Sequence, residues 1–257
     1  MEIKNTTVLI TGASQGIGKA VAKKLAADEC HLILVNRKKD VELQSELKAA
    51  GAKSVQIIEL DLSVRASLEK FAQTHGDLKV DILFNNAGVL TGGLFEKQTL
   101  QEIYDLIQIN IAALMHMTHL FLPGMIQRKS GKVINHASVS ALMHFPSATT
   151  YSASKAAVHA FTECLRQELQ GTGVTTLNLI TPGIKTRMFD QIDEKYSQHF
   201  KIPTMSMPAT KYAEIIRDAI LNDVDVLNPS GLTGIGLKIA KYVPQLFEFE
   251  IRRRFKR

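Results

Sequence analysis

The sequence predicts an α/β protein with a doubly wound parallel sheet, a three-layer α/β/α arrangement and a single domain. Short apolar runs rich in β-branched residues alternate with helical patterns of roughly 10–20 residues, which is typical of βαβ units. The first apolar run leads through a glycine-rich turn directly into a helix. No repeat, low-complexity tract or change of composition divides the 257 residues, so one domain is expected.

The first strand and helix enclose the most distinctive turn. A strand is expected over residues 7–10 and a helix over 19–27, and Thr-Gly-Ala-Ser-Gln-Gly-Ile-Gly lies between them at 11–18. Glycines let the backbone approach a pyrophosphate, and free N–H groups at the start of a helix favour its negative charge. The alternative is an ordinary tight turn between a strand and a helix.

The second strand, expected over 31–35, ends in Asn36 and Arg37. In a dinucleotide-binding fold, an acidic side chain here accepts from the 2′-hydroxyl of the adenine ribose, whereas a basic one accommodates a 2′-phosphate. The acidic residue is absent, and two lysines follow Arg37. The pattern favours NADP(H) over NAD(H), with a solvated run of charges at a helix start as the alternative.

The remaining patterns complete the alternation. Helices are expected over residues 41–50, 65–75, 100–122, 151–170 and 211–221, and strands over 55–60, 81–84, 131–135, 174–180 and 225–227. Short polar motifs follow the strands: Asp61-Leu62-Ser63, Asn85-Asn86-Ala87-Gly88, Ser138 and Thr181-Pro182-Gly183.

Asn110 stands among apolar neighbours in the helix expected over 100–122. A buried asparagine costs about 1–3 kcal/mol unless it is hydrogen-bonded, so this side chain should have partners. It could tie two backbone segments together or take part in chemistry.

Tyr151 and Lys155 are four residues apart, which places them on one face of the expected helix, one turn apart. An ammonium about 4 Å from a phenol would be worth roughly 4 kcal/mol, enough to lower the tyrosine pKa to about 7. General acid–base catalysis is efficient at that pKa, and the Ser138 hydroxyl could hold the reacting oxygen. By itself the spacing also fits an interfacial tyrosine beside a solvated lysine.

Periodicity fades between residues 184 and 209. Met188, Phe189, Phe200, Met205 and Met207 stand there among polar residues. Flexible thioethers and aromatic rings suit an adaptable lid over an apolar substrate, although ordinary packing would use the same residues. We therefore divide the chain into a domain over 1–233, with a substrate loop at 184–210, and a tail over 234–257.

The tail combines apolar residues with a basic end. One short helix, with Ile235, Leu237, Ile239 and Tyr242, is expected to end before Pro244. After it, Leu246, Phe247, Phe249, Ile251 and Phe255 mingle with five cations. Such a segment could lie on an anionic membrane surface, but packing on the domain or on a partner subunit is favoured.

The bulk composition excludes several classes of protein. Net charge is +6, of which Arg252, Arg253, Arg254, Lys256 and Arg257 supply five, so the body carries about +1. Global basicity therefore does not predict nucleic acid binding. Two cysteines are too few for a disulfide framework or a metal site. We expect no membrane-spanning window, no signal peptide and a cytoplasmic location, with peripheral membrane association as the second option.

Taken in order, these motifs resemble the short-chain dehydrogenase/reductase family over roughly residues 5–230. The resemblance rests on the glycine turn at 11–18, Asp-Leu at 61–62, Asn-Asn-Ala-Gly at 85–88, Asn110, Ser138, Tyr-Ser-Ala-Ser-Lys at 151–155 and Pro-Gly at 182–183. It implies a Rossmann-like fold and an NADP(H)-dependent oxidoreductase that interconverts a secondary alcohol and a ketone, with a hydrophobic substrate. The alternative is a non-catalytic sensor or scaffold, which would typically lack the tyrosine or the lysine.

The resemblance also implies a role for each matched residue. Tyr151 would be the general acid or base, Lys155 would lower its pKa and hold the nicotinamide ribose, Ser138 would orient the substrate oxygen, and Asn110 would seat a water that relays protons. The cofactor-binding residues would be Gly12, Ser14, Gln15, Gly16, Ile17, Gly18, Arg37, Asp61, Leu62, Asn86, Ala87, Gly88, Tyr151, Lys155, Pro182, Gly183 and Thr186. Gly12, Gly16 and Gly18 would line the pyrophosphate, and no metal is expected.

The sequence departs from the family pattern at four places. Gln15 replaces a basic residue of many NADP-preferring members, and His136-Ala137 replaces the usual apolar-Ser pair. The loop at 182–186 is one residue shorter than the commonest form, which weakens the expected contact of Thr186 with the nicotinamide. The carboxyl end lacks the usual Gly-rich finish, which favours a homodimer over a tetramer.

Overall fold

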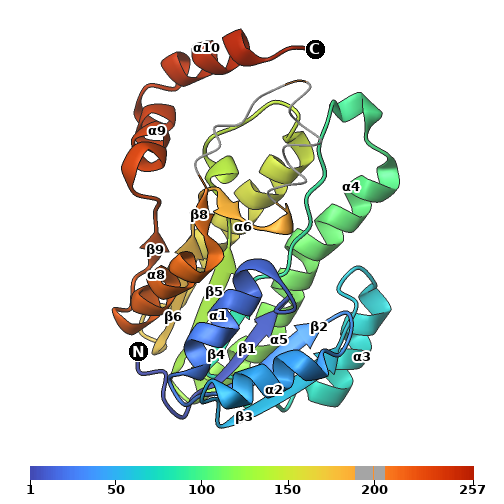
Figure 1. The fold of residues 1–257 in the computed structure, drawn as a ribbon, viewed down its shortest axis with the longest axis vertical. Helices are drawn as coiled ribbons and strands as arrows, with labels where there is room; N and C mark the ends of the chain where they lie inside the picture. The colour runs from blue at the N-terminus through green and yellow to red at the C-terminus, as the bar shows by residue number, and fades with distance from the viewer. Residues whose placement is uncertain (189–198, 200–205) are drawn as a thin grey trace.

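A seven-stranded parallel sheet forms the centre of the computed structural model, which describes residues 1–188, 199 and 206–257 (Figure 1). The strand order is β3-β2-β1-β4-β5-β6-β9. The strands are β1 Thr7–Thr11, β2 His31–Asn36, β3 Ser54–Glu59, β4 Ile82–Asn85, β5 Gly131–His136, β6 Val174–Leu179 and β9 Val226–Leu227. The order reverses between β1 and β4, which is where open α/β sheets bind ligands at the carboxyl ends of their strands. The expected Rossmann-like fold is confirmed.

Helices cover both faces of the sheet. They are α1 Gly16–Ala26, α2 Val41–Ala49, α3 Arg65–His75, α4 Leu100–Ile107, α5 Ala113–Gln127, α6 Thr149–Glu168, α8 Ala209–Leu221, α9 Gly231–Tyr242 and α10 Pro244–Arg254. Helices α1, α2 and α8 pack on one face, and α3, α5 and α6 pack on the other. Three layers follow from this arrangement, as the alternation of strands and helices predicts.

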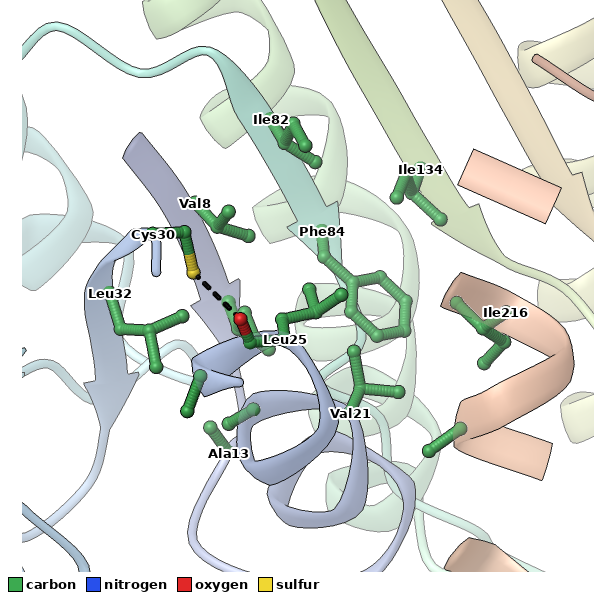
Figure 2. Close-up of a cluster of buried hydrophobic side chains, with 14 of the residues drawn as sticks. Val8, Ala13, Val21, Leu25, Cys30, Leu32, Ile82, Phe84, Ile134 and Ile216 are labelled. Carbon is green, nitrogen blue, oxygen red and sulfur yellow. Dashed lines mark hydrogen bonds between the residues drawn. The ribbon is translucent and has the colours of Figure 1, made fainter. Parts of the chain in front are cut away.

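The two cores arise from the alternation of side chains along each strand. In β1, Val8 and Ile10 belong to the cluster under α1 and α8, whereas Leu9 belongs to the opposite cluster. Figure 2 shows the first cluster, in which the Cys30 thiol donates to the carbonyl of Leu25 at 3.2 Å. Burial raises the pKa of this thiol to about 12, so Cys30 behaves as a buried apolar side chain.

The long helix after β4 differs from expectation. It runs continuously over Leu100–Gln127, with a π-helical turn at Gln108–Ala112 that contains Asn110. By length and composition it is apolar enough to span a membrane, with a mean hydropathy of 1.4, so the expectation that no window would qualify is wrong. However, Leu106, Met117 and Phe121 are buried against the domain, which identifies Leu100–Gln127 as a core helix.

The tail forms two helices instead of one. Helix α9 ends at Tyr242 before Pro244, as expected, but α10 then begins with Pro244 in its first turn. Proline is compatible with that position because the first N–H groups of a helix have no intrahelical partner. The division between residues 233 and 234 falls inside α9, and Leu237 of α9 packs against the domain.

The segment expected to form the substrate loop is only partly described. Ile184–Lys185 (β7) pairs in parallel with Met207–Pro208 (β8), so the two ends of the segment meet. Phe189, Phe200 and Met205 lie outside the described residues.

Candidate active site

A cavity of 1170 Å³ opens at the carboxyl edge of the sheet. Of the predicted site residues, it is lined by Gly12, Ser14, Gln15, Gly16, Ile17, Arg37, Asp61, Leu62, Asn86, Ala87, Gly88, Ser138, Tyr151, Lys155, Pro182, Gly183 and Thr186. Gly18 and Asn110 do not line the cavity but lie directly behind its wall. The sequence motifs therefore converge on one site.

The glycine turn requires both backbone freedom and close contact. Gly12 and Gly16 have positive φ angles of 67° and 58°, which L side chains rarely adopt. A Cβ on Gly12 would lie 2.9 Å from Cα of Ala87. A Cβ on Gly18 would lie 2.5 Å from both the Asn86 amide nitrogen and the Gly12 carbonyl oxygen. Gly18 therefore serves the packing of the turn against the residue that follows β4, and its expected contact with a pyrophosphate stays a prediction.

The end of β2 provides an unsatisfied donor beside a cluster of cations. Asn36 is 3% exposed; its Oδ1 accepts from the backbone N–H of Ala13 at 2.8 Å, whereas its buried Nδ2 has no partner among the described residues. Arg37, Lys38 and Lys39 line the same end of the cavity. A buried amide without a partner costs free energy, so the site is suited to a ligand with an acceptor oxygen here.

Asp61 lies at the carboxyl end of β3, also on the cavity wall. The hydroxyl and the backbone N–H of Ser63 donate to its Oδ1 at 2.7 and 2.9 Å. These hydrogen bonds, with a smaller contribution from the charge of Arg37, hold the pKa of Asp61 below its ordinary value. Asp61 is therefore a fixed acceptor at neutral pH.

Tyr151 lies in the first turn of α6, where the helix dipole favours negative charge. Its phenol is hydrogen-bonded to Ser138. Ser138 is positioned in turn by Ser140, whose backbone N–H donates to the Ser138 hydroxyl at 3.2 Å and whose own hydroxyl lies 2.8 Å away. The structure thus brings the predicted donor and the predicted orienting hydroxyl together.

Lys155 lies one turn further along α6, as the sequence spacing predicts. Its Nζ is 5.7 Å from the centroid of the Tyr151 ring and donates to the carbonyl of His136 at 2.7 Å. Burial lowers the pKa of this ammonium to about 8.

The predicted effect of Lys155 on the Tyr151 pKa is not present in this structure. Burial raises the pKa of the phenol to about 12, and the hydrogen bond with Ser138 offsets only part of that rise. The expectation of about 7 counted the attraction of the ammonium but left out desolvation, which disfavours the charged forms of both groups. That expectation is wrong for the protein without a bound cofactor.

Asn110 has the partners that its burial demands. Its Oδ1 accepts from the backbone N–H of Val89 at 2.8 Å, and its Nδ2 donates to the carbonyl of Val89 at 3.0 Å and to the hydroxyl of Ser154 at 3.1 Å. Asn110 therefore ties the loop that follows β4 to α6. A Cβ on Gly88 would lie 3.3 Å from Asn110 Oδ1 and 3.6 Å from Lys155 Nζ, so both polar groups border the same point.

His136 and Ser140 are site residues to which the sequence reasoning gave no role. The Nδ1 of His136 lies 3.1 Å from Oδ1 of Asn86, whose amide nitrogen donates to the carbonyls of Thr11 and Gly12. Burial, and then the charge of Lys155, lowers the pKa of His136 to about 3. The imidazole is therefore neutral and donates through Nδ1. The Ser-x-Ser spacing after β5 was a usable signal for Ser140, whereas nothing local reveals the contact between His136 and Asn86.

The residues present fit a nicotinamide dinucleotide. The positive-φ glycines admit a close backbone approach, and the buried Nδ2 of Asn36 lacks an acceptor that a ribose or phosphate oxygen would supply. No group of three or more potential metal ligands occurs within residues 1–188, 199 and 206–257.

The profile of the short chain dehydrogenases matches residues 6–197, which include Asn110, Ser138, Tyr151 and Lys155. The chain belongs to the short-chain dehydrogenase family. As a member of this family, it is an oxidoreductase that acts on CH–OH donors.

Three relatives illustrate the similarity of this short-chain dehydrogenase to known proteins. Ketoacyl reductase HetN of Nostoc is 32% identical over 246 residues, covering 93% of this chain and 84% of its own. A short-chain dehydrogenase from Sphingobium yanoikuyae in complex with NADPH has a TM-score of 0.80 at 25% identity, with 96% of each chain covered. A variant of actinorhodin polyketide ketoreductase with NADPH has a TM-score of 0.80 at 25% identity, covering 90% of this chain and 97% of its own.

Proposed function

We propose that this short-chain dehydrogenase uses NADP(H) to interconvert a hydrophobic ketone and its secondary alcohol. The observation that carries the proposal is the convergence of Tyr151, Ser138 and Lys155 on the cavity that also contains the glycine turn and Arg37. A non-catalytic sensor or scaffold would need the dinucleotide site but not the three polar side chains beside it.

The nicotinamide supplies or accepts the hydride when the cofactor is bound. In the reductive direction, Tyr151 donates its phenolic proton to the carbonyl oxygen, which Ser138 holds in place. The ammonium of Lys155 stabilises the phenolate that results, and the helix N-terminus adds to this. Asn110 would seat the water that returns a proton to Lys155.

The proposed preference for NADP(H) rests on the end of β2. Arg37, Lys38 and Lys39 offer three cations, and Asn36 stands where an acidic side chain would repel a 2′-phosphate. Two relatives at 25% identity were solved with NADPH, which supports the same choice.

The proposed hydrophobic substrate rests on the apolar part of the wall of the cavity that Tyr151 also lines. That wall includes Val89, Leu90, Val139, Phe145 and Met188. Two relatives are named a ketoacyl reductase and a polyketide ketoreductase, which supports a keto group on an acyl or polyketide chain as the substrate class.

We further propose a homodimer in the cytoplasm. The missing Gly-rich finish supports the dimer. The free thiols of Cys30 and Cys164 fit a reducing compartment.

The proposal is tested by assaying a panel of ketones and alcohols of increasing chain length with NADPH, NADH and their oxidised forms. Tyr151→Phe keeps the ring and removes the proton donor, so NADPH should still bind while turnover falls by about 10²–10⁴-fold. A variant that kept more than about a tenth of wild-type turnover would show that Tyr151 is not the acid.

A further inference from the structure

Helices α9 and α10 each carry an exposed apolar stripe. On α9 the stripe consists of Leu232, Ile235 and Tyr242, and at α10 it consists of Val243, Leu246 and Phe249. Each set falls on one side of its helix, since residues that are three, four, seven or ten positions apart lie on the same face. We call these six residues the tail stripe.

The opposite sides of both helices pack on the domain. Leu237 of α9 is 8% exposed among Leu114, Val158 and Ile180, and Phe247 of α10 meets the ring of Phe145 edge-on at 6.0 Å. Packing on the domain therefore explains one face of the tail and leaves the tail stripe uncovered. Exposed fractions of 55% for Leu246 and 64% for Phe249 are high for large apolar side chains.

The segment that carries the tail stripe is basic. Residues 231–257 hold seven basic and two acidic side chains, whereas the rest of the chain carries about +1. Lys238 and Lys241 flank the stripe on α9, and Arg252 and Arg253 follow it on α10. Glu248 and Glu250 pair with the arginines of α10 at 2.9–3.3 Å and neutralise only part of the charge.

The charge of the tail helps to decide whether a second copy of the chain or a lipid surface covers the tail stripe. A symmetric contact between two copies of this segment would bring a net charge of about +5, seven basic less two acidic side chains, against an equal one, which like-charge repulsion disfavours. An anionic lipid surface offers both an apolar interior for the stripe and negative headgroups for the cations. The complementary partner is therefore a membrane.

On the side opposite the tail stripe, α10 and the residues after it contact a residue of the active-site cavity wall and the segment expected to cover the substrate. Phe145, which contacts Phe247, lines the cavity, and Arg257 pairs with Glu96 at 3.0 Å. The backbone N–H of Lys256 donates to the carbonyl of His199 at 2.8 Å, in the segment expected to cover the substrate. In Figure 1, α10 crosses the end of the molecule above this region.

We propose that the tail stripe and its cations dock the enzyme on an anionic membrane surface, so that hydrophobic substrates reach the cavity from the lipid. The substrate part of this inference rests on the proposed function, whereas the docking does not. Each cation near the lipid contributes about fivefold to binding, and the stripe makes the attachment persist where salt screens the charges.

The test uses full-length protein and vesicles of phosphatidylcholine with or without 30% phosphatidylserine, at low and high salt (roughly 0.05 and 0.5 M, bracketing physiological screening). The stripe variant is Leu246→Ser with Phe249→Ser, and the charge variant is Arg252→Ala with Arg253→Ala. The matched control is Leu100→Ser with Tyr104→Ser, which removes two similarly exposed large apolar side chains from α4. Co-sedimentation measures vesicle binding, light scattering measures oligomeric state, and NADPH-dependent reduction of a water-soluble ketone measures basal activity.

We expect wild type and control to bind the anionic vesicles, the charge variant to bind at least tenfold more weakly, and the stripe variant to lose binding. Basal activity should be unchanged in all variants. Absence of vesicle binding by the wild type would overturn the proposal. A stripe variant that binds vesicles normally but becomes monomeric would also overturn it and assign the stripe to a subunit interface. Lack of turnover with every ketone would refute the proposed function and leave the docking result standing.

Discussion

Burial dominates the electrostatics of individual residues in this site. Tyr151, Lys155 and His136 all have pKa values displaced toward their neutral forms, and desolvation is the largest cause for each. The resting site therefore favours a protonated phenol, the form required to donate a proton to a ketone. Charges that enter with a cofactor would change this balance, because they act in the same low-dielectric surroundings.

His136 should make the stability of the protein dependent on acid pH. Its pKa is about 3 in the folded state against 6.5 ordinarily, so the unfolded chain binds a proton that the folded chain refuses between these values. The neutral His136 side chain therefore stabilises the folded protein at neutral pH. This stabilisation is lost as the pH falls from about 6.5 toward 3, at up to about 1.4 kcal/mol per pH unit. Urea unfolding at pH 7 and 5 should show a smaller loss for His136→Leu than for wild type. Identical losses in both proteins, or an equal effect of the exposed control His144→Leu, would contradict this account.

Arg37 should discriminate between the two nicotinamide cofactors. A charge-assisted contact with a 2′-phosphate is worth about 1.5–3 kcal/mol, so Arg37→Ala should weaken NADPH binding roughly 10–150-fold and leave NADH nearly unchanged. Titration of each cofactor by fluorescence gives the dissociation constants. Lys48→Ala, on an exposed turn of α2, is the control for loss of one positive charge. Equal losses for both cofactors would show that Arg37 acts on the fold instead.

At the scale of secondary-structure elements, local patterns predicted most of what the structure contains. The helix expected over 65–75 has these bounds, because its apolar and polar positions and its turn residues agree. The π-helical turn at Gln108–Ala112 was not predicted, since it arises where Asn110 binds Val89 and Ser154 from other elements. The same reason explains the missed roles of His136 and Ser140. Contacts between distant segments leave no periodic signal in the sequence.

The contact between the glycine turn and β4 should be the least tolerant point of the first βα unit. A Cβ on Gly18 would meet Asn86 Nδ2 and the Gly12 carbonyl at 2.5 Å, so Gly18→Ala forces the turn away from β4. We expect a loss of about 1–3 kcal/mol of stability and weaker NADPH binding. Gly236→Ala is the control. Gly236 lies within helix α9, and a Cβ there would lie 3.3 Å from the flexible end of the Met143 side chain. Thermal and urea unfolding should show that the Gly236→Ala protein is as stable as wild type or slightly more stable. A harmless Gly18→Ala would show that the turn can move.

At the scale of the whole molecule, the tail changes how far the folded domain extends. Sequence composition placed the boundary at residue 233, where a segment of apolar residues with a basic end begins. In the structure, α9 joins the core through Leu237, which completes a cluster with Leu114, Ala137, Val158 and Ile180. Composition could not show this, because one buried leucine among exposed neighbours does not alter the average character of the segment.

Two truncations should therefore differ in their effect on folding. Ending the chain after Val243 removes α10 and the contact of Phe247 with the ring of Phe145. Ending it after Thr233 also removes most of α9 and uncovers the Leu237 cluster. Because burying a leucine contributes roughly 1.5–3 kcal/mol, the shorter chain should be less stable than the longer one by about that amount. Urea unfolding at 25 °C gives the difference, and NADPH binding reports whether the cofactor end of the cavity survives in both. Equal stability of the two chains would place α9 outside the domain and restore the boundary at residue 233.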